Sequence, residues 1–440
     1  MQQNQYHHYI PRFLLRNFAI NIYERIFVSN EKLLKSIEKK KYKQSFKNKN
    51  KLEALLQTYD RTLGKLNTSL TGKTYGYTNM YKDFDDKDVM RVEKKLATLE
   101  MQASKVIHDI LRASQKENQV VLLSVELNNL YKFLFIMDYR KPHRWSQFIN
   151  GNFDAGTLPI VKEFMQEYKL QSTREVWLQN IREILDTEHN KIKDNLRILK
   201  PDRDDYVNRM MDRFLVIWQA GENDEFITTS NGFGIFEGMN EILNVPVPQF
   251  QFQYAYHYFY VISPKLVLVL CTVFFRKELS KVMPSLIKKY PSIFENVPRP
   301  PVPKCVKLSK EDGHSIDESS FTPLDFLLNS QGYKTEESEK YTFPFVRVTS
   351  ATVHKVNTVL LNETKPDLVL TFLSHSFLYK TIVKYHKNRD FNINHDFSSL
   401  KKNLFIALNR THEENLKLRS NIPAGHVCNW NVCVMGSEPN

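Results

Sequence analysis

Two glutamates and a histidine are the residues whose types and spacing point most directly to chemistry. Glu93 and Glu100 lie in a segment of helical apolar period, and a separation of seven places them on one helix face. His8 would have a pKa near neutrality and could act as a general base, with the glutamates as acids or metal ligands. We therefore predict a catalytic centre of His8, Glu93 and Glu100. Carboxylates at the edge of an apolar stripe can equally be structural partners of arginine.

Three arginines and an asparagine are candidate substrate-binding residues. Arg12 and Arg16 are four residues apart, so in a helix they could hold one phosphate or carboxylate together. Arg140 follows an apolar helical segment, where it is either a cation at the helix C-terminus or an anion clamp. Asn231 precedes Gly232 in a row of hydrogen-bonding side chains, which fits either a tight turn or a loop that faces a ligand.

Helical periodicity and capping signals predict the elements that would position these residues. The Asp85–Asp86 pair offers an N-cap, and a long helix should follow it. We expect further helices over about Ser124–Tyr139, after a capping box at 172–175, over 204–219, from residue 350, and over 374–385.

Strand signals dominate between these helical regions. Residues 225–236 and 249–275 are rich in Phe, Tyr, Val, Ile and Thr, and polar and apolar residues alternate at 250–254. The apolar run at 266–275 is too short to span a bilayer and predicts a buried strand. Glycines at intervals through 55–81 indicate a hairpin or meander. We predict an α+β fold with a predominantly helical core and a small, mostly antiparallel sheet.

The composition suggests three parts of the chain. Residues 1–290 would form the main domain, with a Lys-rich loop at 31–51. Residues 291–344 are polar and rich in Pro, Ser and Glu, and are expected to be a linker or an insertion. Residues 345–440 would form C-terminal helices that pack on the main domain.

The formal net charge of +13 is unevenly distributed. Residues 31–51 contain nine Lys and two Glu. Such a run is commonly a solvated loop, but it would also fit a nucleic acid or another polyanion. Only two aromatic residues stand among its lysines, fewer than a stacking platform for single strands usually has.

Four cysteines do not make a disulfide framework, and no apolar leader follows the first residue, so we expect an intracellular protein, cytoplasmic or nuclear. No membrane association is predicted. The cluster of His426, Cys428 and Cys433 has too few ligands for a structural zinc site. The sequence identifies no metal site, no cofactor and no oligomeric state.

The N-terminal stretch contains His8, Tyr9, Pro11, Leu15 and Phe18 in the spacing His-Tyr-x-Pro-x-x-x-Leu-x-x-Phe. This pattern resembles the opening signature of a family of unknown function, DUF4238, found in fungi and bacteria. Later motifs of the family match at 92–93, 99–100, 137–140, 226–231, 234–238 and 262–264. The family's strand motif commonly carries an acidic residue where this chain has Ser230. If that carboxylate is catalytic in relatives, the resemblance implies that this chain is impaired or uses another group.

Two functions from different classes fit these residues. One is a hydrolase-like enzyme acting on a phosphate-containing or nucleic-acid substrate, in which Arg16 and Arg140 clamp the anion beside the His8, Glu93 and Glu100 centre. The other is a non-catalytic binding protein whose His, Glu and Arg side chains form a buried structural network. The enzyme predicts an open pocket lined by these groups, whereas the binding protein predicts a closed and paired interior.

Overall fold

The computed structural model describes residues 4–20, 54–84, 86–237, 256–272, 292–294, 297–298, 304–306, 339–363, 368–389, 391, 393 and 395–420. Four predicted features lie wholly or mostly outside this part of the chain: the Lys-rich loop at 31–51, the alternating residues at 250–254, the polar segment at 291–344, and the cluster of His426, Cys428 and Cys433.

A mixed sheet forms the centre of the fold. Its strands run in the order β11 (Lys304–Val306), β12 (Lys340–Arg347), β6 (Arg213–Gln219), β10 (Leu266–Thr272), β9 (His257–Ser263) and β8 (Ile235–Phe236), and β5 (Gln119–Leu123) also pairs with β12. The β12–β6 pair is parallel, whereas the other pairs are antiparallel. The α+β class is therefore confirmed, but the prediction of a small and mostly antiparallel sheet is corrected, because this sheet is larger and mixed.

The segment at 204–219 is not the helix that its sequence pattern predicted. Its first residues are the last residues of α9 (Lys200–Tyr206). A π-helical turn at Val207–Met211 follows, and the segment then continues as β6. The five residues at 214–218 are all apolar and all buried, and β6 has a neighbouring strand on each side. A strand covered on both faces has no polar alternation, so its short apolar run resembles a turn and a half of buried helix.

Two smaller sheets complete the strand structure. The order β3 (Lys65–Leu70), β2 (Leu55–Asp60), β13 (Val369–Phe372) and β7 (Thr228–Thr229) makes one of them, and β1 (Tyr6–His8) pairs antiparallel with β4 (Gly76–Thr78) in the other. The hairpin predicted within 55–81 is confirmed as β2–β3. Both β12 and β13 lie after residue 339, so the C-terminal part of the chain contributes strands to two of the sheets.

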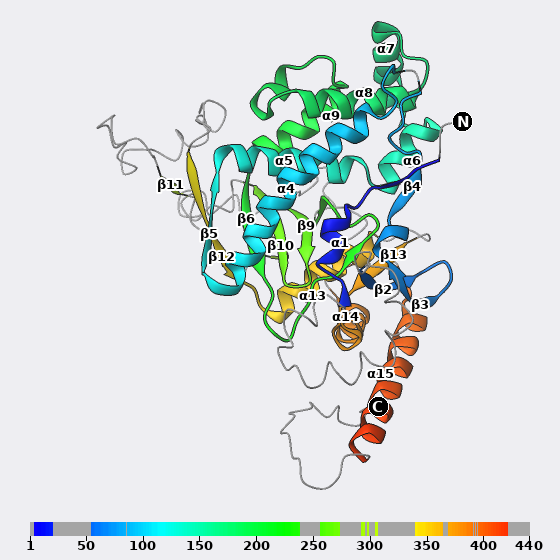
Figure 1. Ribbon diagram of the computed structural model, residues 1–440, viewed down its shortest axis with the longest axis vertical. Coiled ribbons are helices and arrows are strands. Elements are labelled where there is room, and N and C mark those ends of the chain that lie inside the picture. Colours follow the sequence, from blue (N-terminus) through cyan, green and yellow to red (C-terminus); the bar gives the residue numbers. More distant parts are fainter. Residues whose placement is uncertain are drawn as a thin grey trace, which may run out of the picture.

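The helices gather at two ends of the molecule, with the sheets between them (Figure 1). One group contains α4 (Arg91–Lys116), α5 (Ser124–Tyr139), α6 (Pro142–Asn150), α7 (Thr157–Tyr168), α8 (Thr173–Asp186), the 3-10 turn η2 (His189–Asp194) and α9; the other contains α13 (Ser350–Asn362), α14 (His375–Lys387) and α15 (Ser398–Ser420). The short helix α1 (Arg12–Arg16) contacts the 3-10 turn η1 (Thr71–Lys73). Among the described residues, no helix has the length and apolarity needed to cross a membrane.

The long helix α4 carries the predicted apolar stripe but begins later than its capping signal indicated. Val92, Leu96 and Leu99 are buried, as are the residues that continue the stripe toward the C-terminus of the helix. The first helical residue is Arg91, because the Asp86 and Asp88 carboxylates accept hydrogen bonds from the backbone N–H of residues 88 and 90 and form turns ahead of the helix. This start leaves Glu93 in the first turn of α4 and Glu100 two turns further on.

Candidate functional site

The N-terminal strand β1 places its two histidines on opposite faces. Successive residues of a strand point to opposite sides. His7 is 1% exposed: its ring stacks on Tyr81 with centroids 5.4 Å apart, and its Nδ1 accepts a hydrogen bond of 2.9 Å from the Tyr81 backbone N–H. The half-buried His8 faces outward and donates from Nδ1 to the Thr74 carbonyl at 3.0 Å. The imidazole inside the protein is therefore that of His7, and not that of the predicted His8.

Glu93, Glu100 and Arg140 come together with Tyr81, and we call these four residues the interior ion network. Arg140 is fully buried, and its Nη1 donates to Glu100 Oε1 at 2.7 Å, while its Nη2 contacts the Met137 sulfur at 3.0 Å. The Tyr81 hydroxyl interacts with the Arg140 guanidinium and also donates to the His8 carbonyl at 3.1 Å. His8 thus joins the network through its backbone.

Burial and charge set the protonation of these groups. Burial raises the pKa of Glu93, and the Glu100 charge adds to that effect while Arg140 opposes it. Burial favours the neutral form of Arg140, yet Tyr81 and Glu100 hold its pKa above the ordinary value. Burial lowers the pKa of His7 to about 4, with smaller contributions from Lys82 and His8. At neutral pH the network therefore contains a charged arginine, and the histidine beside it is neutral.

The network is enclosed on the Arg140 side, and it is not completely paired. Arg140 Nε and His7 Nε2 are buried without a hydrogen-bond partner among the residues that the structure describes. The Glu100 side chain is 28% exposed, so water reaches the carboxylate side of the ion pair and not the guanidinium side.

Asn231 contacts the start of α6, next to the junction between α5 and α6. Its Oδ1 accepts a long hydrogen bond of 3.4 Å from the His143 backbone N–H, in the first turn of α6, so it helps to satisfy the free donors at that helix end. The same junction holds Asp138, which pairs with Arg209 at 2.7 Å and Lys141 at 2.5 Å. Gly234 packs so closely on Asp138 that a Cβ would lie 2.7 Å from its carboxylate.

Arg12 and Arg16 form part of a surface region that we call the N-terminal patch, made of Tyr6, His8, Arg12, Arg16 and Lys73. Both arginines are exposed on α1, which packs on η1, and Lys73 is exposed at the end of η1. The Tyr6 hydroxyl lies 3.5 Å from the Lys73 carbonyl, and the Tyr6 and His8 rings meet edge to face with centroids 5.2 Å apart. The predicted site residues are therefore divided between the interior ion network, the N-terminal patch, and the end of α6.

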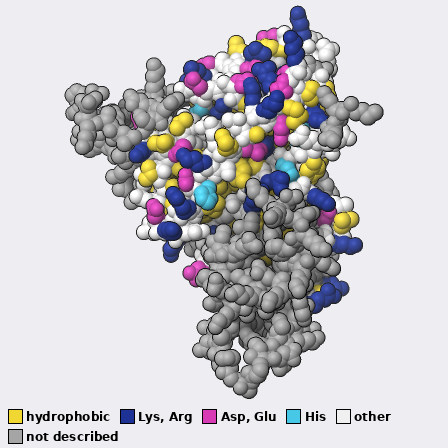
Figure 2. Space-filling view, viewed as in Figure 1, with side chains coloured by type: hydrophobic (Ala, Val, Ile, Leu, Met, Phe, Trp, Pro, Cys, Tyr) yellow, Lys and Arg dark blue, Asp and Glu magenta, His cyan; other side chains and the backbone are white. Residues whose placement is uncertain are grey.

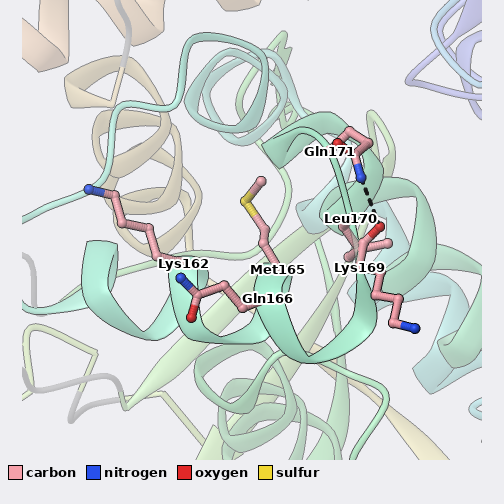
Figure 3. Close-up of a pocket in the computed structure, with 6 residues that line it drawn as sticks. All are labelled: Lys162, Met165, Gln166, Lys169, Leu170 and Gln171. Carbon is pink, nitrogen blue, oxygen red and sulfur yellow. Dashed lines mark hydrogen bonds between the residues drawn. The ribbon is translucent and has the colours of Figure 1, made fainter.

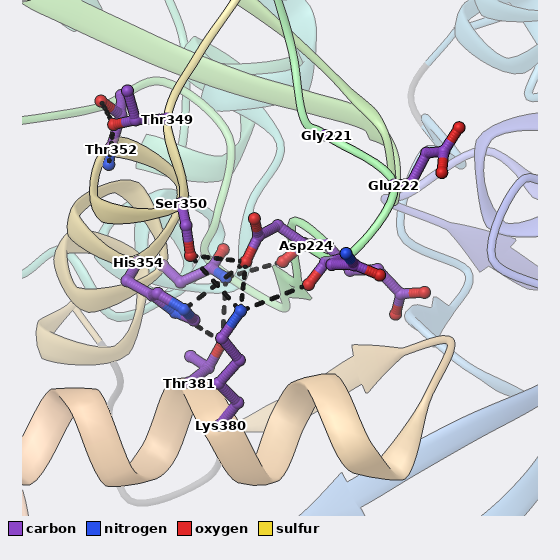
Figure 4. A network of polar contacts seen from close by, with 12 residues as sticks. Gly221, Glu222, Asp224, Thr349, Ser350, Thr352, His354, Lys380 and Thr381 are labelled. Atoms are coloured by element: carbon purple, nitrogen blue, oxygen red, sulfur yellow. Dashed lines mark hydrogen bonds and ion pairs between the residues drawn. The ribbon is translucent and has the colours of Figure 1, made fainter. Parts of the chain in front are cut away.

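A second polar network joins the loop at 221–225 to α13 and α14 (Figure 4). The Asp224 carboxylate accepts hydrogen bonds from Ser350 at 2.8 Å and Lys380 at 2.9 Å, and His354 Nε2 lies 3.7 Å from the same oxygen. Burial lowers the pKa of His354 to about 4, and burial raises the pKa of the neighbouring Glu225 to about 7. The sequence motifs did not indicate this network, because its members come from three distant segments with no shared spacing.

A surface pocket of about 470 Å³ lies elsewhere, at the C-terminal end of α7 (Figure 3). Its lining consists of Lys162, Met165, Gln166, Lys169, Leu170 and Gln171. None of these residues belongs to either polar network or to the N-terminal patch, and none is a carboxylate or a histidine. In the described part of the chain, no group of three or more His, Cys, Asp or Glu side chains is arranged to hold a metal ion.

Comparison with protein families identifies the chain. The profile of a family described as protein of unknown function (DUF4238) matches residues 6–370. The chain belongs to the DUF4238 family. Searches of curated proteins and of solved structures find no match to it.

The DUF4238 match begins within β1 and ends within β13, so it includes the interior ion network and the N-terminal patch. Ser230, which stands where the resemblance implied an acidic residue, is buried, and its backbone N–H donates to the Val369 carbonyl at 3.0 Å. Its neighbour Thr229 is fully buried beside Gly232, where a Cβ would lie 2.9 Å from the threonine hydroxyl oxygen. The family motif at 226–231 is thus the tightly packed end of strand β7.

Proposed function

We propose that this DUF4238 protein binds a phosphate-rich polyanion through its N-terminal region, and that the interior ion network serves as scaffold. The distribution of charge along the chain carries this proposal. Residues 1–82 contain sixteen Lys and Arg against five Asp and Glu, which accounts for +11 of the total net charge of +13. The other 358 residues are close to neutral, so the positive field of the protein originates near its N-terminal region.

The described residues of this region support the proposal. Residues 4–20 and 61–82 contain no Asp or Glu, and four of their six cations, Arg12, Arg16, Lys65 and Lys73, are exposed. Lys65 lies opposite Asp60 in the β2–β3 pair. On the face of the molecule shown in Figure 2, by contrast, Lys and Arg side chains over the end formed by α4 to α9 are interspersed with Asp and Glu. A surface with nearby carboxylates neutralises its own cations, whereas one without them can release counterions when phosphates bind.

The interior ion network supports the scaffold role. Arg140 is fully buried and its guanidinium already contacts Glu100 and Met137, so in this arrangement it cannot touch a phosphate in solution. Buried arginines of this kind hold elements in register; here Arg140 joins α5 to α4. The burial of Arg140 supports the structural role that the binding hypothesis gives to this network.

The test compares charge reversals in two places. The first triple variant combines Lys39→Glu, Lys40→Glu and Lys41→Glu. The matched control combines Lys191→Glu, Lys193→Glu and Lys200→Glu, and its lysines are exposed on η2 and α9. Fluorescence anisotropy with labelled oligonucleotides between 50 and 200 mM salt should show at least about tenfold weaker binding for the first variant only, with a shallower salt dependence. Equal losses in both variants, or no salt-dependent binding by the unmodified protein, would contradict the proposal.

A second function, hydrolysis of a phosphate-containing or nucleic-acid substrate, is favoured by one observation. Glu93 is half-buried beside Glu100 and has a raised pKa, which is the property of a general acid. In that function Glu93 would give a proton to the leaving group and Arg140 would orient Glu100.

The experiment for this function is turnover of a labelled oligonucleotide and of an activated phosphodiester from pH 5 to 9, with and without Mg²⁺ or Mn²⁺. Loss of turnover in Glu93→Gln, with an unchanged melting temperature, is the result expected of an enzyme. Absence of turnover in the unmodified protein under all these conditions would leave only the binding function.

A further inference from the structure

We propose that one face of helix α14, which carries Lys380, Lys384 and Lys387, binds the phosphate backbone of a nucleic acid. We call these three residues the α14 lysine face. This inference rests on the proposed polyanion-binding function, and it adds the class of polyanion and a second binding surface. That surface lies in the C-terminal part of the chain, far in sequence from the N-terminal region that carries most of the net charge.

Charge is distributed differently over the two groups of helices. Helices α13 and α14 contain no Asp or Glu, and the first acidic residue of α15 is Glu413, beyond the middle of that helix. In the other group, α4, α5, α7, α8 and α9 each contain at least two carboxylates. The residues after position 82 are close to neutral only as a whole, because cations are in excess on the C-terminal helices.

The spacing of the three lysines places them on one side of α14. They are four and three residues apart, so their side chains project from the same face of the helix. Lys384 and Lys387 are exposed, and the Lys380 side chain is 41% exposed. At a rise of about 1.5 Å per residue the face extends over about 10 Å. One strand of a duplex carries about three phosphates in that length along its axis.

Two of these lysines are not neutralised within the protein. In the part of the chain that the structure describes, the side chains of Lys384 and Lys387 make no ion pair and no hydrogen bond. Lys380 differs, because its ammonium group donates to the Asp224 carboxylate at 2.9 Å. Lys384 and Lys387 are therefore available for an external anion, while Lys380 also fastens α14 to the loop at 221–225.

A carboxylate that approaches α14 does so from another side of the helix. Asp396 lies 4.0 Å from the Nε2 atom of His386, which also accepts the Phe397 backbone N–H at 3.3 Å. Successive residues of an α-helix are turned by about 100°, so His386 does not share the face of its neighbour Lys387. Asp396 therefore does not oppose the α14 lysine face.

The helix dipole explains only part of this composition. It favours cations in the last turn of a helix, which holds Lys384 and Lys387. It equally favours carboxylates in the first turn, and α14 has none there. The carboxylate at that end comes instead from Glu225, which accepts the Ser374 backbone N–H at 3.1 Å. A solvated face usually alternates lysine with glutamate, so a face of lysines alone fits an external polyanion better.

The chemistry of the face selects phosphates and not bases. A lysine ammonium group is a point charge that binds a phosphate without a fixed geometry, in contrast to the planar fork of arginine. Contacts to phosphates carry no sequence information. We therefore expect this surface to hold the backbone of a nucleic acid of any sequence.

The experiment measures binding of the full chain to two labelled 20-base-pair duplexes of unrelated sequence between 50 and 200 mM salt. The variant Lys384→Gln with Lys387→Gln should weaken binding to both duplexes about tenfold and reduce the salt slope by about 1.8, because two phosphate contacts are removed. The matched control is Lys162→Gln with Lys169→Gln. It removes two exposed lysines from α7 and its C-cap, where the helix also carries two glutamates, and should change the affinity less than about twofold.

Thermal melting of both variants verifies that the fold is retained, and the variant with glutamates at positions 39–41 separates this inference from the proposed function. If Lys384→Gln with Lys387→Gln binds like the unmodified protein, while the 39–41 variant loses affinity, the α14 lysine face is not a binding surface and polyanion binding stands. A preference for one duplex sequence would overturn recognition of the backbone alone. Displacement of the duplex by polyphosphate at a lower phosphate concentration than by unlabelled DNA would overturn the assignment to nucleic acid. If the unmodified protein binds no duplex at any salt concentration, the proposed function itself fails.

Discussion

The interior ion network and the N-terminal patch are connected by a single strand, β1, yet the two regions treat charge in opposite ways. In the network, Arg140 is enclosed and its charge is matched by Glu100 at 2.7 Å. In the patch, Arg12, Arg16 and Lys73 are exposed on segments that contain no carboxylate. The residues of both regions would qualify as a catalytic centre by type alone.

The difference teaches that burial decides what a charged residue can do. A buried charge must be paired within the protein, because leaving it unpaired costs several kcal/mol, so its partner is already chosen. An exposed charge interacts weakly with its neighbours and is available for a ligand. Four predictions follow this contrast from the network outward to the patch.

The largest effect is expected from Arg140→Met. It removes a fully buried guanidinium and leaves Glu100 without its partner, so it should destabilise the protein by about 3 kcal/mol. Urea unfolding measures the change. Adding Glu100→Gln should recover part of the loss, and Arg16→Met, an exposed control, should change stability by less than about 0.5 kcal/mol. Equal effects of Arg140→Met and Arg16→Met would show that the network contributes nothing to the fold.

The second prediction compares the neighbouring histidines of β1. His7→Ala removes a buried ring that stacks on Tyr81 and accepts its backbone N–H, so it should cost about 2 kcal/mol. His8→Ala removes one hydrogen bond from a half-buried ring and should cost less than about 1 kcal/mol. Chemical denaturation of both variants tests the alternation, and the reverse order would place the wrong histidine in the interior.

The third prediction concerns pH. Burial lowers the pKa of His7 in the folded protein to about 4, so the unfolded chain takes up its proton first as the pH falls. Stability should therefore be lost between about pH 6.5 and pH 4, and His7→Gln should remove part of this loss. The raised pKa of Glu225, about 7, has the opposite sign: Glu225→Gln should stabilise the protein at pH 8 and have no effect near pH 4. Unfolding curves across this pH range that are parallel for all three proteins would contradict both assignments.

The smallest effect on stability is expected in the patch. Arg12→Gln with Arg16→Gln should shift the free energy of unfolding by less than about 0.5 kcal/mol, because both side chains are exposed. The same variant should nevertheless weaken polyanion binding more than Arg140→Met does. A substantial loss of stability would mean that the patch, like the network, is part of the scaffold.

Local signals in the sequence predicted many of the elements. The stripe of α4, the span of α5 and the Ser172 N-cap of α8 depend on residues within a few turns of one another, and the structure has all three. The second half of the predicted capping box is absent, because the Glu175 carboxylate accepts from the Gln171 backbone N–H instead of that of Ser172. The β2–β3 hairpin follows from its turn glycine, Gly64, at φ 63°. The error at 204–219 arose where burial on both faces removed the polar alternation from β6.

The predictions for the site residues show the same difference between local signals and contacts of distant segments. Seven-residue spacing on one helix was enough to predict that Glu93 and Glu100 share a face, and charge counting was enough to find an excess of cations near the N-terminus. The choice of His7 over His8 depends on the register between β1 and β4, two strands separated by nearly seventy residues. The network of Asp224, Ser350, His354 and Lys380 likewise depends on contacts between distant segments.

The sequence by itself therefore determined which groups the protein possesses, the period of its helices and the imbalance of its charge, because these are set by neighbours along the chain. Only the tertiary structure decided which charges are enclosed and which meet solvent. Burial depends on what the rest of the chain packs against each residue, and that information is spread over segments hundreds of residues apart.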